Sequence, residues 1–142
     1  MQVRIDNALL DSLTEQAKGS VRLRMSYDLR NSAADLSQRM LNAVEPGSVI
    51  PIHRHQKTSE TMVVLRGRVV VELYDELERI CSSVYEVYPG GDIYALDIPP
   101  GTWHTLRALE SGTVILEMKD GSYEPIQDCD VLSRQESNLK MK

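Results

Sequence analysis

The sequence predicts an all-β domain with one short helix at its amino-terminal end. Short stretches of alternating or β-branched apolar residues recur along the chain, and turn-forming residues separate them at regular intervals. Helical patterns do not alternate with these stretches, which argues against a parallel α/β sheet. About eight or nine short, evenly spaced strands favour a closed antiparallel barrel or a double-sheet jelly roll. The 142 residues correspond to a single domain without a long linker or repeat.

The helix is predicted in the stretch "DNALLDSLTEQAK", which begins at Asp6. Its apolar residues recur at near-helical spacing, Asp6 is suited to the N-cap, and Gly19 is suited to end the helix. We therefore expect residues 1–20 to form a short amphipathic helix that packs on the barrel.

The remaining stretches predict strands and turns up to residue 125. The predicted strands lie in "VRLRMSY" (21–27), "QRMLNAV" (38–44), "TMVVLRGRVVVELY" (61–74, two strands around a turn at 66–68), "ICSSVYEVY" (80–88), "DIYALDI" (92–98), "WHTLRAL" (103–109) and "TVILEMK" (113–119). The last two flank a Glu-Ser-Gly turn and predict a hairpin. We expect residues 21–125 to form the barrel and the polar residues 126–142 to form a tail.

Composition excludes some classes of function. A net charge of −5 argues against a general nucleic-acid binder, which needs a basic surface. There is no apolar run of about 20 residues, as a membrane span requires, and the first residues lack a signal-peptide core. We therefore expect a cytoplasmic protein that contacts neither membrane nor nucleic acid. In that compartment Cys81 and Cys129 are expected to be free thiols.

The three histidines of the chain form a pattern. His53 and His55 are one residue apart, so in an extended segment they lie on the same side, with Arg54 on the other. Glu60 follows five positions later, and His104 comes directly after the turn "PPGTW". Three imidazoles and a carboxylate suit a divalent transition metal. A base-and-nucleophile site and a polar surface strand remain alternatives at this point.

Two longer stretches resemble the signatures of the cupin superfamily. "GSVIPIHRHQKTSETMVVLRG" matches the first signature at Gly47, His53, His55, Glu60 and Gly67, and "GDIYALDIPPGTWH" resembles the second, which ends at His104. The resemblance implies a single-domain cupin jelly-roll β-barrel. It also implies that His53, His55, Glu60 and His104 hold one divalent ion (Zn, Fe, Mn, Ni or Co) in the mouth of the barrel.

A closer resemblance, covering residues 22–125, is to the WbuC family of small cupin-fold metalloproteins. It is carried by "RLRMSYDLR", "QRMLNAVEPGS", "PIHRHQKTSETMVVLRGRV" and "IPPGTWHTLRALESGTVILEMKDGSYEP". The family occurs among bacterial genes for surface-polysaccharide (O-antigen) synthesis. This implies an enzyme or accessory factor that acts on a saccharide-like ligand, such as a sugar or sugar nucleotide, with the metal as a Lewis acid. The alternative is a non-catalytic, metal-dependent binding or sensor module.

Several further residues have open roles. Arg22 and Arg24 share one face of a predicted strand and could hold a phosphate or carboxylate, although surface salt bridges are the commoner role. Arg39 and Asn42 have opposite parity, so at most one of them lines the barrel. Because jelly rolls often cover their sheet edges by pairing, we also expect a homodimer.

Three other residues could lie near the predicted metal site, namely Trp103, Glu117 and Tyr123. Trp103 is expected to be a packed core aromatic rather than a wall of the site. Glu117 and Tyr123 could reach the mouth of the barrel or belong only to the hairpin and tail.

Overall fold

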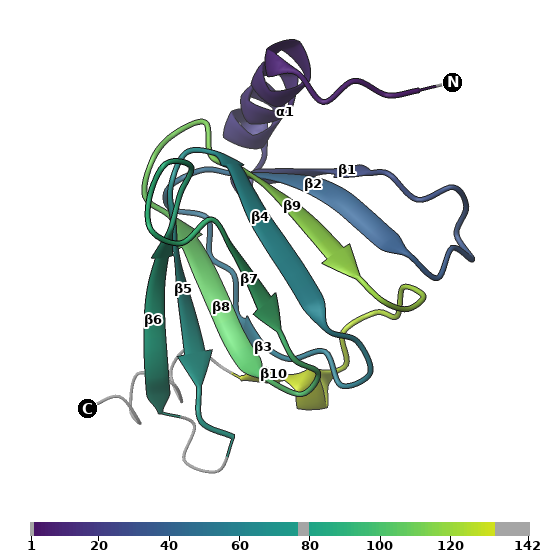
Figure 1. Ribbon diagram of the computed structural model, residues 1–142, viewed down its shortest axis with the longest axis vertical. Coiled ribbons are helices and arrows are strands. Elements are labelled where there is room, and N and C mark those ends of the chain that lie inside the picture. The colour runs from purple at the N-terminus through teal and green to yellow at the C-terminus, as the bar shows by residue number, and fades with distance from the viewer. Residues whose placement is uncertain (1, 77–79, 133–142) are drawn as a thin grey trace.

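Two five-stranded antiparallel sheets pack face to face in the computed structural model, which describes residues 2–76 and 80–132 (Figure 1). Sheet A contains, in spatial order, β1 (Arg24–Asp28), β2 (Gln38–Val44), β9 (Val114–Lys119), β4 (Glu60–Arg66) and β7 (Ala95–Ile98). Sheet B contains β10 (Val131–Leu132), β3 (Ile52–His53), β8 (Trp103–Ala108), β5 (Val69–Tyr74) and β6 (Cys81–Val87). This arrangement is the double-sheet jelly roll, so the predicted fold class is confirmed.

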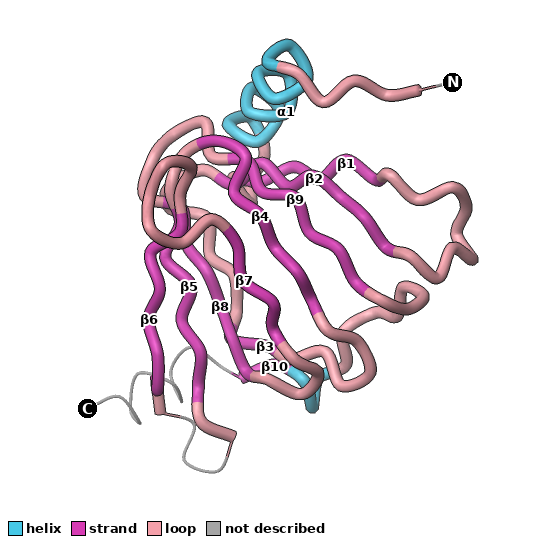
Figure 2. Tube along the Cα trace, viewed as in Figure 1, coloured by secondary structure: helices cyan, strands magenta, loops and turns pink. Residues whose placement is uncertain are grey.

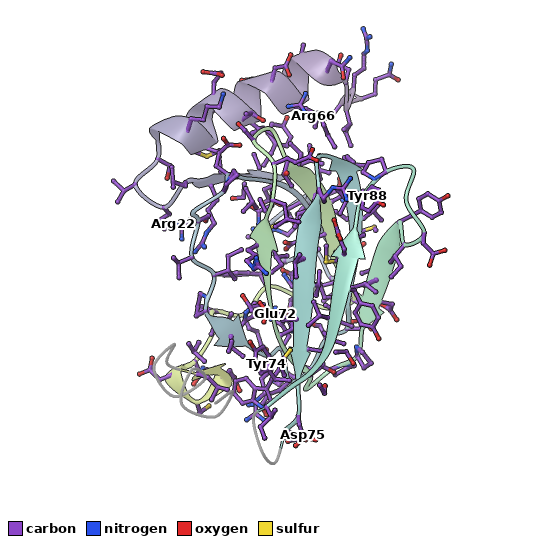
Figure 3. All side chains as sticks on the ribbon, turned by 90° about the vertical axis from the view of Figure 1, so that its left-hand side faces the viewer. Arg22, Arg66, Glu72, Tyr74, Asp75 and Tyr88 are labelled. Carbon is purple, nitrogen blue, oxygen red and sulfur yellow. The ribbon has the colours of Figure 1, made fainter. Side chains whose placement is uncertain are left out.

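The helix α1 (Asn7–Gly19) lies outside the barrel against sheet A (Figure 2). Asp6 caps it as predicted, because its carboxylate accepts a hydrogen bond from the backbone N–H of Leu9 at 3.1 Å. The apolar side of α1 packs on the outer face of β2 and β9 in a cluster of Leu10, Leu13, Ala17, Leu41, Ala43 and Val114. Arg66 also ties β4 to the helix, with its guanidinium bonded to Asp11 and Thr14 (Figure 3).

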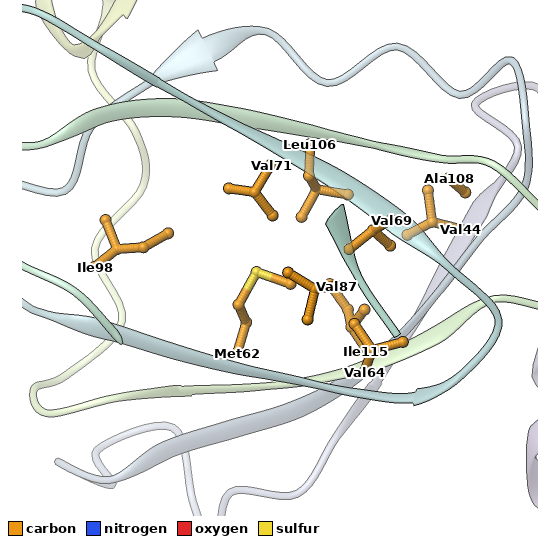
Figure 4. Close-up of a cluster of buried hydrophobic side chains, with 10 residues drawn as sticks. All are labelled: Val44, Met62, Val64, Val69, Val71, Val87, Ile98, Leu106, Ala108 and Ile115. Atoms are coloured by element: carbon orange, nitrogen blue, oxygen red, sulfur yellow. The ribbon is translucent and has the colours of Figure 1, made fainter. Parts of the chain in front are cut away.

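The main core lies between the two sheets and closes one end of the barrel. Figure 4 shows its members, which are Val44, Met62, Val64, Val69, Val71, Val87, Ile98, Leu106, Ala108 and Ile115. They come from both sheets and alternate along each strand with residues of the opposite face, as the period of two requires.

The predicted hairpin between residues 103–109 and 113–119 is wrong. β8 pairs with β3 and β5 in sheet B, whereas β9 pairs with β2 and β4 in sheet A. The turn signal was correct, since Gly112 adopts a left-handed φ of 85°. However, the Glu45 carboxylate accepts hydrogen bonds from the Gly112 N–H and the Ser111 hydroxyl, which holds this turn beside the end of β2. A turn residue indicates where the chain reverses and leaves the pairing partner open.

The turn at residues 66–68 likewise carries the chain from sheet A to sheet B. Gly67 has a φ of 85°, and a Cβ placed on it would lie 2.6 Å from the Cα of Thr113. A side chain at this position would therefore clash with the neighbouring backbone, which explains the glycine.

The first predicted strand begins later than expected. Residues 20–22 form a turn, Val21 is fully exposed, and Leu23 adopts a left-handed φ of 57° before β1 begins at Arg24. The expectation that Arg22 and Arg24 share one strand face is therefore wrong, because Arg22 lies in the connection from α1 (Figure 3).

The barrel extends beyond the predicted boundary at residue 125. A 3-10 turn, Asp128–Asp130, leads into β10, which pairs with β3 through Val131 opposite His53. Leu132 is buried with Ile52, Tyr74 and Trp103, so Trp103 is a core aromatic as predicted. Residues 126–132 are thus not a free tail, since this segment supplies a strand and a core residue. Residues 133–142 of the predicted tail lie outside the described residues.

Two smaller expectations concern cysteines and membranes. Cys81 and Cys129 are free thiols, as expected. In the part of the chain that the structure describes, no helix combines the length and apolar character needed to cross a bilayer. The compartment itself stays a prediction.

Candidate metal centre

The fold brings the three histidines together at the open end of the barrel. His53 ends β3 and lies directly opposite His104 on β8, and His55 follows two residues after His53. Their ring centroids are 4.4 Å apart for His53 and His104, 5.1 Å for His53 and His55, and 5.8 Å for His55 and His104. One ring nitrogen from each lies within 4.8 Å of the other two. This spacing suits three ligands of one ion.

Backbone carbonyls orient two of the rings. The Nδ1 atom of His53 lies 2.9 Å from the carbonyl oxygen of Pro51, and that of His104 lies 2.8 Å from the carbonyl oxygen of Thr102. A carbonyl oxygen only accepts, so Nδ1 carries the proton in both rings and Nε2 is the nitrogen available for a ligand. The backbone N–H of Gly101 donates to the carbonyl oxygen of His55 at 2.8 Å. This bond joins the segment after β3, which contains His55, to the turn that precedes His104 on β8.

Glu60, the first residue of β4, contacts the histidine cluster through His104. Its Oε2 lies 3.0 Å from Nε2 of His104, and its Oε1 lies 3.5 Å from Nζ of Lys119. Burial raises the pKa of the Glu60 carboxyl, but the hydrogen bond and charge of His104 and the charge of Lys119 outweigh it and hold this pKa below its ordinary value. The Glu60 carboxylate is therefore ionised beside the cluster.

The pKa values of the three imidazoles are shifted in different directions. Burial lowers the pKa of His53 to about 4, with the charge of His104 adding to the effect, and burial also lowers the pKa of His55 to about 4. For His104, burial lowers the pKa, but the hydrogen bond and charge of Glu60 outweigh it and raise the pKa overall. His53 and His55 are thus neutral at physiological pH, which is the form that binds a metal.

A cavity of about 930 Å³ opens above the histidines. The inner face of sheet A lines its opposite wall with Arg24, Gln38, Asn42, Glu117 and Lys119. The prediction that at most one of Arg39 and Asn42 lines the barrel is confirmed, since Asn42 lines this cavity. Arg39 instead donates hydrogen bonds to the carbonyl oxygen of Leu29 and to Asp35.

Glu117 lines the cavity, which agrees with the first of its two predicted roles, a position at the mouth of the barrel. Burial, followed by the negative charge of Glu60, raises the pKa of its carboxyl to about 7. The side-chain amide of Asn42 donates to its Oε1 at 3.5 Å, and Nζ of Lys119 lies 3.9 Å from its Oε2. A carboxyl group of this kind can hold or release a proton near neutral pH.

The segment after β9 forms part of the cavity rim. Tyr123 lies there, and Asp130 accepts hydrogen bonds from Nε of Arg54 at 2.9 Å and from Nε2 of Gln56 at 2.6 Å. The Arg54 guanidinium also stacks 4.6 Å from the ring centroid of Trp103. The Asp130 carboxylate thus binds both neighbours of His55, which are Arg54 and Gln56.

Sequence reasoning missed Lys119 and Asp130. A signal for Lys119 was present, because Lys119 has the same parity as Glu117 and so shares its strand face. No local pattern indicates Asp130, because it lies 76 residues after Arg54 in the sequence and meets it only in the folded protein.

The fold and the site together define a cupin jelly roll, and solved structures of cupin proteins agree. A cupin 2 domain-containing protein from Halorhodospira halophila matches with a TM-score of 0.61 and 20% identity over 82% of this chain and 75% of its own. KdgF from Halomonas sp. matches with a TM-score of 0.57 and 19% identity over 70% of this chain and 82% of its own. These identities establish the fold alone.

A third solved structure is the capsular polysaccharide assembling protein CapF from Staphylococcus aureus. It matches with a TM-score of 0.52 and 25% identity over 64% of this chain, which spans 24% of the length of CapF.

The chain belongs to the family described as "Domain of unknown function (DUF6016)", whose model matches residues 5–85. A search of curated proteins finds no significant match. The closer resemblance to the WbuC family stays a prediction.

Proposed function

We propose that the protein is a cupin metalloprotein that holds one divalent transition-metal ion through His53, His55, His104 and Glu60. The observation that carries this proposal is the convergence of three imidazoles, two of which are oriented by carbonyl oxygens at Nδ1, so that Nε2 faces the cluster. Zn, Fe, Mn, Ni and Co all accept such a set.

The charge arrangement fits a cation at this position. Both ring nitrogens of His104 have acceptors, so its second proton lies toward the Glu60 carboxylate. Loss of that proton would free Nε2 of His104 and the carboxylate together as ligands. The ion, once bound, would supply a Lewis acid that polarises a carbonyl, hydroxyl or carboxylate oxygen of a substrate.

The cavity supports a small saccharide-like substrate, such as a sugar or sugar nucleotide. Its volume of about 930 Å³ lies within the usual range for small-molecule sites, and its wall offers amides and charged groups to hydroxyl groups. Glu117 lies in this wall, where it could exchange a proton with a bound substrate. The WbuC resemblance and the match to a capsular polysaccharide assembling protein favour a role in bacterial surface-polysaccharide (O-antigen) synthesis.

The alternative is a module that binds metal and ligand without turnover. Such a module would need no acid or base in its pocket, so the placement of Glu117 favours an enzyme or an accessory factor that holds a reactive ligand.

The predicted homodimer stays a prediction, which light scattering of the purified protein tests.

Elemental analysis of purified and reconstituted protein tests the metal proposal. We expect about one divalent ion per chain, retained in Glu86→Gln and lost or weakened in Glu60→Gln and in His53→Ala, His55→Ala and His104→Ala. Glu86 is a suitable control because its carboxylate pairs with Arg68 on the outside of the barrel. Substoichiometric metal in reconstituted wild-type protein would contradict the proposal.

A further inference from the structure

Arg24 lies on the inner face of sheet A. It pairs with Val44 across β1 and β2, and residues that pair directly in an antiparallel sheet point to the same side. Val44 belongs to the core between the two sheets, so Arg24 also points inward, and it lines the cavity. β1 therefore directs a guanidinium into the same space as the three histidines.

Within the described residues, Arg24 is the one charged cavity-lining residue that makes no ion pair. The other cavity-lining cations pair with carboxylates: Arg54 with Asp130, Lys57 with Glu124, and Lys119 with both Glu60 and Glu117. Arg24 makes one hydrogen bond, from Nη1 to the carbonyl oxygen of Val49 at 2.9 Å. That bond fixes the side chain and leaves most of its five N–H donors free.

The charge of Arg24 lies in an unfavourable environment. Burial lowers its pKa, and the neighbouring charge of Arg22 lowers it further, whereas the charge of Glu117 acts in the opposite direction. A partly buried guanidinium without a carboxylate is stabilised when an anion binds to it.

The backbone before Arg24 is strained. Leu23 adopts a φ of 57°, and it is the one non-glycine residue with positive φ in the described part of the chain. Its carbonyl oxygen accepts from the N–H of Glu45, and the Ser48 hydroxyl donates to the carbonyl oxygen of Arg22. These bonds hold the kink that separates exposed Arg22 from inward-pointing Arg24, and such strain is typical of ligand sites.

From these observations we infer that Arg24 binds an anionic group, a carboxylate or phosphate, of a ligand that occupies the cavity between sheet A and the histidines. The ligand is thus an acidic saccharide, a sugar acid or a sugar phosphate, rather than a neutral sugar. This inference rests on the proposed function only in that the ligand is a saccharide in the same cavity. Planar guanidinium forks bind both oxyanions in bidentate fashion.

Binding of glucuronate, glucose 1-phosphate and glucose to the full chain tests this inference, with titration calorimetry or NMR at millimolar concentrations. We expect at least one of the two anions to bind more tightly than glucose. Arg24→Gln should weaken binding of that anion by about tenfold or more and leave glucose unchanged. Arg22→Gln is the matched control, and it should bind all three probes like the wild type.

The two anions identify the group that Arg24 binds. Tighter binding of glucuronate indicates a carboxylate, for which Arg24→Lys should not restore affinity, because lysine lacks the bidentate fork. Tighter binding of glucose 1-phosphate indicates a phosphate, for which Arg24→Lys should restore part of the affinity. Unchanged thermal unfolding of each variant shows that it is folded.

Three results would overturn the inference: no detectable binding of either anion, no preference for an anion over glucose, or equal losses in Arg24→Gln and Arg22→Gln. Measuring the metal content of the same samples separates this inference from the proposed function. An Arg24-dependent preference for anions in protein that takes up no metal would support the anion site and contradict the metal centre. Stoichiometric metal without that preference would do the reverse.

Discussion

Beside the cavity, the two faces of β2 and β9 in sheet A have opposite character, although the same strands form both. On the outer face of β2 and β9, Leu41, Ala43 and Val114 are at most 1% exposed beneath α1. On the inner face, Asn42 and Glu117 alternate with these residues and line the cavity. A half-exposed sheet usually buries its apolar face toward its partner sheet, but here a helix buries the outer face as well.

This difference shows how the barrel accommodates a polar site. The outer face and the closed end of the barrel supply apolar burial, which is the main source of folding free energy. The inner face at the open end can therefore carry buried Glu60 and partly buried Glu117 and Lys119, with Nζ of Lys119 lying within 4 Å of both carboxyl groups.

The largest expected effect separates the two faces directly. Leu41→Ala should lower the free energy of unfolding by about 2–5 kcal/mol, because it leaves a cavity under α1. Asn42→Ala, one residue along the same strand, should cost at most about 1 kcal/mol. Urea unfolding followed by circular dichroism measures both. Equal losses would show that the inner face contributes as much stability as the outer one.

Glu117 should destabilise the metal-free fold as pH rises. The unfolded carboxyl ionises near its ordinary pKa, whereas the folded one ionises at about 7, so between these values the folded state binds more protons. The free energy of unfolding therefore falls as pH rises through this window. Glu117→Gln should remove this part of the pH dependence, on the order of 3 kcal/mol between pH 4 and 8. Urea unfolding of both proteins across this range tests the prediction, and identical pH profiles would contradict it.

Asp130 should act as a positioning residue for the metal ligands. Asp130→Ala removes the acceptor that holds Arg54 and Gln56 on either side of His55, so we expect metal affinity to fall about tenfold. Glu124→Ala, which removes an exposed rim carboxylate paired with Lys57, is the control and should leave affinity unchanged. Competition with a chelating dye measures both. If the two variants behave alike, the pairing of β10 with β3 alone positions the loop.

The last expected effect is a gradual loss of metal affinity in acid. Because the pKa of His104 is raised above its ordinary value of 6.5, protons should begin to compete with the metal above pH 6.5 as pH falls. Affinity should then drop about tenfold per pH unit until His53 and His55 also titrate near pH 4. Metal titrations in buffers between pH 8 and 5 measure this slope. A constant affinity over that range would argue against His104 as a ligand.

Several features could be predicted from sequence because their causes are local. The N-cap at Asp6 and the helix after it follow from contacts within one or two turns. The turns at Gly67 and Gly112 follow from backbone conformations that glycine adopts easily. The histidine pattern, read with the cupin resemblance, predicted which residues meet at the open end of the barrel, and the structure brings His53, His55 and His104 together there.

Other features depend on contacts between distant parts of the chain. The alternation in β1, β2 and β9 was visible in the sequence, but the sequence does not reveal which face meets the opposite sheet. Packing of α1 decided this, because it gave the apolar residues a place outside the barrel. The same holds for β8 and β9, which join different sheets, and for β10, which pairs with β3 far from it in sequence.

Neighbours along the chain are enough to specify the helix, the turns, the strand periodicity and the chemical types of the site residues. Long-range packing is needed to turn Arg24 and Glu117 toward the histidines, to place Lys119 beside Glu60, and to bring Asp130 to the loop of His55. The physical reason is that a strand's period of two defines two faces without assigning either to the interior, and only burial against the rest of the molecule makes that assignment.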